Sequence, residues 1–81
     1  MTNRDVARIL DRIADMLQIK DENPFKIRAY RKAADSIYHL DEDLAYIHKN
    51  GRIGDIPAVG KALQSKIEEM LEKGSCEYYE R

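Results

Sequence analysis

The 81-residue chain has little that could cross-link it or chelate a metal. Its single cysteine, Cys76, excludes a disulfide within the chain and a zinc site built from several thiolates. The two histidines, His39 and His48, lie nine residues apart with no second chelating pair, which argues against a transition-metal site. No apolar run approaches the roughly 20 residues of a membrane span, and the start "MTNRDVARIL" lacks the apolar block of a signal peptide. We therefore expect a cytoplasmic protein that does not contact membranes.

An excess of positive charge is also missing. Fourteen basic side chains are balanced by fifteen acidic ones, so the net charge is −1. A strong, non-specific grip on DNA usually shows as a basic patch or a high pI, so any nucleic-acid binding by this chain must be local. The charge is unevenly placed, because "KIRAYRK", residues 26–32, holds four basic residues and no acid. The balance of 43% hydrophobic and 36% charged residues predicts one small globular domain.

Helical periodicity covers the first half of the chain. Residues 3–20 repeat apolar side chains at three- and four-residue spacing, which predicts a helix with Asn3 as its N-cap. A second helix is predicted from Pro24 to about His39, with Asn23 as its cap and the proline at the first helical position.

The second half of the chain predicts two shorter helices and no strand. Asp41 can cap a third helix that stops at Gly51, and the last helix is expected from near Gly60 to Gly74. The predicted fold is all-α, a compact bundle of four to five short helices in one domain spanning residues 1–81. The residues expected in its core are Val6, Ile9, Leu10, Ile13, Ala14, Leu17, Phe25, Ala29, Ala33, Ala34, Ile37, Leu44, Ile47, Leu63, Ile67, Met70 and Leu71.

The segment "IPAVGKALQSKI", residues 56–67, has the composition of a turn that leads into a helix. Pro57 fixes one backbone angle, and Gly60 permits either a positive φ or the close approach of another backbone. Unpaired amides at such a turn and helix N-terminus suit a phosphate anion. An ordinary corner between two helices is the alternative, because proline and glycine occur in any loop. The amides concerned belong to Ala58, Val59, Gly60, Lys61 and Ala62.

This segment resembles the second half of a helix-hairpin-helix motif, whose usual form is apolar-Pro-Gly-apolar-Gly. Three stretches together, "NRDVARILDRIADML", "NPFKIRAYRKAADSI" and "GRIGDIPAVGKALQSKIEEMLEKG", resemble the amino-terminal domain of family X DNA polymerases. The middle stretch is especially similar to the bacterial and archaeal members. The resemblance implies a domain that binds gapped or nicked DNA, holds its 5′-phosphate, and is fused to a polymerase catalytic domain.

The resemblance also implies roles for individual residues. Backbone carbonyls of Gly54, Ile56 and Val59 would coordinate Na⁺ or K⁺, whereas no tightly bound cofactor is expected and Mg²⁺ would belong only to a fused polymerase domain. Lys66 matches a lysine that forms a Schiff base with an abasic sugar phosphate, and Tyr30 matches a tyrosine that assists it. The candidate DNA-binding residues are Lys26, Arg28, Arg31, Lys32, Pro57, Ala58, Val59, Gly60, Lys61 and Ala62.

The chain departs from the family pattern at five positions. Ala58 replaces the first hairpin glycine, where a positive φ would cost roughly 1 kcal/mol or more. Gln64 stands in place of a small alanine, and Ser65 in place of an acid. Phe25 and Ala62 replace a histidine and a phosphate-binding lysine of the best-known member. Three functions stay open: a DNA-binding domain, an active 5′-deoxyribose-phosphate lyase, and a protein-interaction module that has lost DNA binding.

Overall fold

The computed structural model describes residues 1–74, a range that is helical and contains no strand. The all-α prediction is therefore confirmed, while Cys76 lies outside the described residues. No helix within this range is long and apolar enough to cross a membrane. The elements are α1 (Asn3–Ile19), α2 (Pro24–Tyr38), α3 (Leu44–Lys49), the 3₁₀ turn η1 (Ile53–Asp55) and α4 (Lys61–Lys73).

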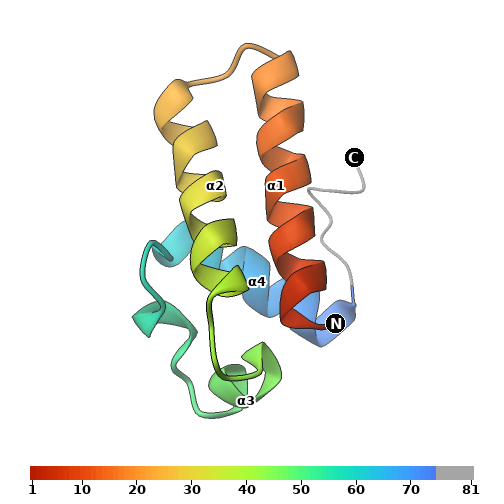
Figure 1. The fold of residues 1–81 in the computed structure, drawn as a ribbon, viewed down its shortest axis with the longest axis vertical. Coiled ribbons are helices and arrows are strands. Elements are labelled where there is room, and N and C mark those ends of the chain that lie inside the picture. The colour runs from red at the N-terminus through yellow and green to blue at the C-terminus, as the bar shows by residue number, and fades with distance from the viewer. Residues whose placement is uncertain (75–81) are drawn as a thin grey trace.

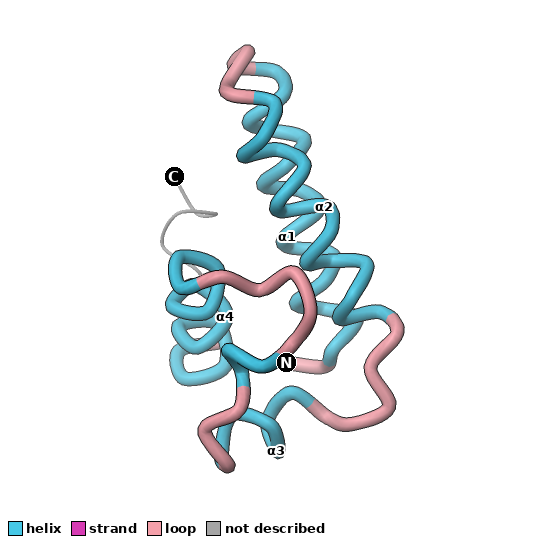
Figure 2. The backbone as a smooth tube through the Cα atoms, turned by 90° about the vertical axis from the view of Figure 1, so that its left-hand side faces the viewer, coloured by secondary structure: helices cyan, strands magenta, loops and turns pink. Residues whose placement is uncertain are grey.

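The elements form two units that pack on each other. α1 and α2 lie side by side as a long antiparallel pair (Figure 1). α3, η1 and α4 gather toward the end of that pair opposite its connecting turn (Figures 1 and 2). The sequence α3–η1–α4 is a helix, a turn and a second helix, as the helix-hairpin-helix resemblance implies. The hairpin, residues 56–60, joins η1 to α4.

α1 begins one residue earlier than the sequence indicated. The prediction of Asn3 as N-cap is wrong, because Thr2 caps the helix by accepting from the Asp5 amide at 3.1 Å. The Asp5 carboxylate accepts from the Thr2 amide at 3.0 Å, which completes a capping box. Asn3 instead holds the loop before α3, since its side chain donates to the Glu42 carbonyl at 2.7 Å and accepts from the Leu44 amide at 2.8 Å.

The other helix ends follow the sequence more closely. Asn23 caps α2 as predicted, by accepting from the amide two residues later at 2.8 Å. The prediction of Asp41 as the cap of α3 is wrong, because Asp43 takes that position. The glycine stops are confirmed: Gly51 follows α3 with φ +67° and Gly74 ends α4 with φ +75°.

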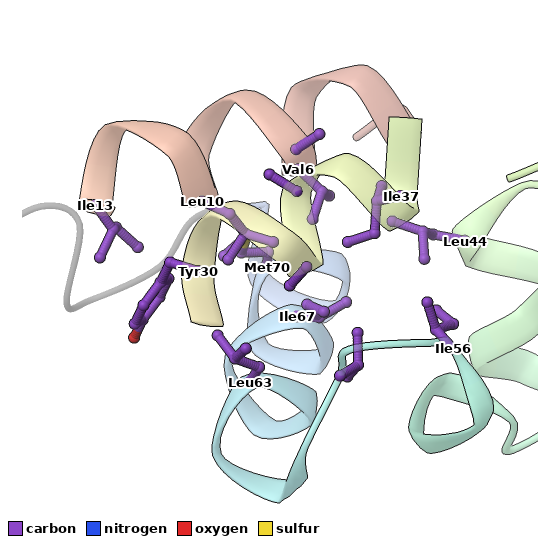
Figure 3. Close-up of a cluster of buried hydrophobic side chains, with 14 of the residues drawn as sticks. Val6, Leu10, Ile13, Tyr30, Ile37, Leu44, Ile56, Leu63, Ile67 and Met70 are labelled. Carbon is purple, nitrogen blue, oxygen red and sulfur yellow. The ribbon is translucent and has the colours of Figure 1, made fainter. Parts of the chain in front are cut away.

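One apolar cluster joins both units (Figure 3). Most of the predicted core is confirmed, but Phe25 is 76% exposed and Ala29 is also exposed. Tyr30 points inward from the same helix, and Phe25 lies five positions earlier, about 140° away around the helix axis. Ile9 and Leu71 are only partly buried. The buried residues are Val6, Ala7, Leu10, Ile13, Ala14, Leu17, Tyr30, Ala33, Ala34, Ile37, Leu44, Ile47, Ile53, Ile56, Val59, Leu63, Ile67 and Met70.

Candidate nucleic-acid interface

The hairpin has the features of a type II turn. The Val59 amide donates to the Ile56 carbonyl at 3.1 Å, Pro57 is the second residue, and Ala58 is the third with φ +70°. A glycine usually holds this third position, so Ala58 keeps the glycine-like backbone angle despite its methyl group. Ile56 and Val59 are buried and anchor the turn, which leaves Pro57 and Ala58 exposed at its tip.

Gly60 is the N-cap of α4 and has an extended backbone. Its φ is −84° and its ψ is −178°, so of the two expectations for this residue the positive φ is wrong. A Cβ added at Gly60 would meet no atom within 4 Å, so the surface beside it is open. α1, α2 and α3 are each capped by a side chain, whereas no side-chain cap hydrogen bond is formed at Gly60. The first amides of α4 therefore lack the side-chain acceptor that the other helices have.

A pocket of about 450 Å³ lies where the hairpin and the start of α4 meet α2. It brings together Lys26 and Tyr30 of α2 with Lys66 of α4, which is distant in sequence but adjacent in space. Three of the lining residues are lysines and none is acidic, so the pocket favours an anion. The lining residues are Lys26, Ala29, Tyr30, Ala58, Gly60, Lys61, Ala62, Leu63 and Lys66.

The two predicted catalytic residues, Tyr30 and Lys66, have different surroundings in this pocket. Tyr30 is only 3% exposed, and its ring packs in the core while its hydroxyl end points out of the apolar cluster (Figure 3). Lys66 is half-buried on α4. The pocket also includes Ala29 and Leu63, which the sequence indicated only as core residues. No sequence signal distinguishes them from other small or apolar helix positions.

A second groove, of about 830 Å³, follows the outer face of α2 and shares Ala58 with the pocket. Its three cations are matched by three carboxylates, so it offers a phosphate much less net attraction than the lysine-lined pocket does. Its lining residues are Gln18, Asp21, Glu22, Pro24, Ile27, Arg28, Arg31, Lys32, Asp35, Ser36 and Ala58.

The four basic residues of α2 are not equivalent in the structure. Lys26 lines the lysine pocket, whereas Arg28 and Lys32 are exposed along the second groove. The Arg28 guanidinium lies 6.0 Å from the centre of the Phe25 ring. Arg31 is held against α1, because its guanidinium pairs with carboxylates of that helix at 2.8 and 3.6 Å.

The carbonyls proposed for a cation lie in two consecutive elements: Gly54 is in η1, whereas Ile56 and Val59 belong to the hairpin. Carbonyl oxygens of Gly54, Ile56 and Val59 are the ligand type that binds K⁺ in proteins. The Ile56 carbonyl accepts from the Val59 amide and keeps its second lone pair for another partner. Within residues 1–74, no group of three or more His, Cys, Asp or Glu side chains could hold a metal ion.

Comparison with known proteins supports this architecture. Residues 1–76 match the model of the helix-hairpin-helix domain. Over 74 residues the chain is 32% identical to the DNA polymerase/3'-5' exonuclease PolX of Bacillus subtilis; the match covers 91% of this chain and 12% of that protein. The chain thus spans only a small part of this curated relative's length. The chain belongs to the helix-hairpin-helix domain family and is homologous to a segment of a bacterial PolX polymerase.

Proposed function

We propose that this domain binds gapped or nicked DNA through the sugar–phosphate backbone and holds a 5′-phosphate in the lysine pocket. The observation that carries the proposal is the pocket between α2 and the hairpin, where Lys26, Lys61 and Lys66 surround the N-terminus of α4. Amides at that N-terminus donate to a phosphate, and the helix dipole adds to the attraction of the three lysines. The similarity to a DNA polymerase is the second support.

In this proposal backbone amides and backbone carbonyls around the hairpin both contribute to DNA binding. The Ala58 and Gly60 amides approach a phosphate, and a Na⁺ or K⁺ ion on the carbonyls of residues 54, 56 and 59 neutralises a second one. These contacts are made to backbone atoms, so the domain would discriminate DNA structure rather than base sequence. Arg28 and Lys32 extend the contact along α2, while Arg31 contributes least because α1 carboxylates already hold it.

A titration with gapped duplexes tests the proposal. The 5′-phosphorylated duplex should bind more tightly than the unphosphorylated one. The logarithm of the binding constant should fall with log salt at a slope of about −4 to −5, because the three pocket lysines, Arg28 and Lys32 would each contribute about −0.9. Lys26→Ala should weaken binding about three- to tenfold. Lys20→Ala is the matched control, because Lys20 is an exposed lysine at the end of α1 outside the pocket.

Gly60→Ala provides a sharper test of the hairpin. Its φ of −84° suits alanine and its Cβ meets no protein atom, so the variant should fold normally. The added methyl group would nevertheless occupy the surface that the DNA backbone approaches, and affinity should fall at least tenfold. Equal and negligible binding of the wild-type domain to both duplexes at low salt would overturn the proposal. A flat salt dependence would instead favour the protein-interaction module.

The second candidate function is a 5′-deoxyribose-phosphate lyase, and the position of Lys66 in the same pocket favours it. The neutral amine would attack the C1′ aldehyde of an abasic sugar and form a Schiff base with loss of water. β-Elimination would then release the 3′-linked phosphate. Borohydride should trap a covalent adduct on the wild-type domain and on Lys73→Ala, but not on Lys66→Ala. Absence of any adduct would remove this candidate and leave phosphate binding.

The length of the relative suggests the wider context. We propose that this domain is fused to a polymerase catalytic domain and positions the DNA gap for it. The described residues hold none of the clustered carboxylates that polymerase metal ions need. In this arrangement nucleotide addition and Mg²⁺ belong to the catalytic domain.

A further inference from the structure

Gln64, on the first turn of α4, lies against the backbone of Gly54 in η1. A Cβ built on Gly54 would be 2.8 Å from Gln64 Oε1, which is closer than real Cβ atoms approach, and in ordinary contact with its Cδ at 3.4 Å. Gly54 does not have a positive φ, so its backbone angle is not what requires a glycine. The Gln64 amide occupies the space that a side chain at position 54 would need, so it would have to move to admit one.

The orientation of the Gln64 amide is fixed from its other end. Its Nε2 donates to Glu68 Oε2, one turn further along α4, at 3.3 Å. With Nε2 held by this bond, Oε1 lies on the side of Gly54 where a Cβ would be. Glu68 Oε2 also lies 3.9 Å from His48 Nδ1 on α3. One row of side chains therefore connects α3, α4 and η1.

We propose that Gln64 is a positioning residue for the hairpin. It fixes η1 relative to α4, and it thereby sets the Gly54 carbonyl and the turn that follows it. Gln64 is not among the residues that line the lysine pocket, so it acts through the backbone of η1 rather than by touching a ligand. Its effect on DNA rests on the proposed function, whereas its effect on the hairpin does not.

A double-mutant cycle between positions 54 and 64 tests the packing. Gly54→Ala should displace the Gln64 amide and lower Tm by only about 2–4 °C, because the overlapping atoms are the end of a flexible side chain that can move. Gly54→Ala combined with Gln64→Ala should recover most of that loss, because the shortened side chain at position 64 leaves room for the methyl group. Ser65→Ala is the matched control: Ser65 is the exposed neighbour of Gln64, and its loss should restore nothing.

Two further measurements separate positioning from stability alone. Gln64→Ala should shift the backbone amide resonances of residues 53–60 in the free protein, whereas Ser65→Ala should leave them in place. Gln64→Ala should also weaken binding of a 5′-phosphorylated gapped duplex roughly threefold or more. In the same variant, the K⁺ concentration needed for half-maximal DNA binding at constant ionic strength should rise.

Each outcome decides a separate point. Equal destabilisation by Gly54→Ala in the presence and absence of Gln64 would show that the two residues do not contact each other. Unchanged resonances at residues 53–60 in Gln64→Ala would refute the positioning role. If the wild-type domain does not bind the duplex, the proposed function fails, while the thermal cycle and the free-protein resonances still decide whether Gln64 positions the hairpin.

Discussion

Replacing Ala58 by glycine should stabilise the domain. Ala58 has φ +70°, in the left-handed region that costs an L-residue roughly 1–2 kcal/mol. Glycine avoids that cost but loses more backbone entropy on folding, about 0.5–1 kcal/mol relative to alanine. At the middle of these two ranges, the difference favours glycine by about 0.75 kcal/mol. For a domain of this size, that gain raises Tm by roughly 2–8 °C.

Thermal unfolding followed by circular dichroism measures the shift, and a urea titration should show a higher midpoint with an unchanged m-value. Two controls bracket the effect. Gly60→Ala should leave Tm nearly unchanged, because the backbone entropy gained by replacing a glycine is offset by the weaker preference of alanine for the N-cap position of α4. Asp21→Gly should raise Tm by less than Ala58→Gly, because Asp21 has φ +58° but aspartate tolerates this conformation better than alanine.

The result that refutes this reasoning is an unchanged or lower Tm for Ala58→Gly while Gly60→Ala behaves as expected. The hairpin would then not hold a positive φ at position 58 in solution. The type II turn would be excluded with it, and the amides of the hairpin would no longer be directed as the phosphate site requires.

Three further changes test other parts of the structure. Asn3→Ala should lower the free energy of unfolding by about 1–2 kcal/mol in urea, because the part-buried Leu44 amide loses its acceptor. Arg31→Ala should cost at most about 1 kcal/mol, an effect that shrinks in high salt, because the ion pairs it removes are exposed. The hydrogen bond from the Thr2 amide lowers the pKa of Asp5, so its stabilising effect is present above the ordinary aspartate pKa of 3.8 and is lost as the pH falls through the lower folded pKa. Urea midpoints between about pH 2 and 6 should therefore fall less in Asp5→Asn than in the wild type.

The helices were predictable because each carries an apolar stripe and its own stop signals. The choice of cap was not, because the sequence offers several capping residues in a row at two of the starts. Thr2 and Asn3 are adjacent. The Thr2–Asp5 capping box is a local signal that favours Thr2, whereas the loop before α3 engages the Asn3 side chain through Glu42 and Leu44. Local patterns do not contain that contact between residues about forty positions apart.

The inward face of α2 was ambiguous for a related reason. Small or apolar side chains occur on both sides of this helix, so periodicity alone selected Phe25 and Ala29 together with Ala33 and Ile37. Contact with α1 and α4 settles the choice, and Tyr30 becomes the inward aromatic residue. The roles of the four basic residues of α2 were equally hard to predict, since nothing near Arg31 in the sequence reveals that α1 carboxylates hold it.

The candidate site depended on family resemblance for a physical reason. Residues 26–30 and 58–66 form one pocket only because the hairpin packs beside α2, and a linear pattern cannot register that contact. The resemblance supplied Lys26, Tyr30 and Lys66 as separate matches, and the structure brings all three into one pocket. Their chemical roles stay predictions for the experiments above.

The net charge of −1 does not by itself decide whether the domain binds DNA. At physiological salt, charges separated by more than about 8 Å are largely screened, so a bound phosphate is influenced mainly by its immediate neighbours.

At about 4 Å and an effective dielectric constant near 20, one such neighbour contributes about 4 kcal/mol before desolvation is counted. We therefore expect the three lysines of the pocket to influence a phosphate bound there more than the net charge of the chain does. In the groove along α2, by contrast, the opposite charges lie within the same short range and largely cancel. We predict that the DNA affinity of the domain depends on the lysine pocket rather than on pI.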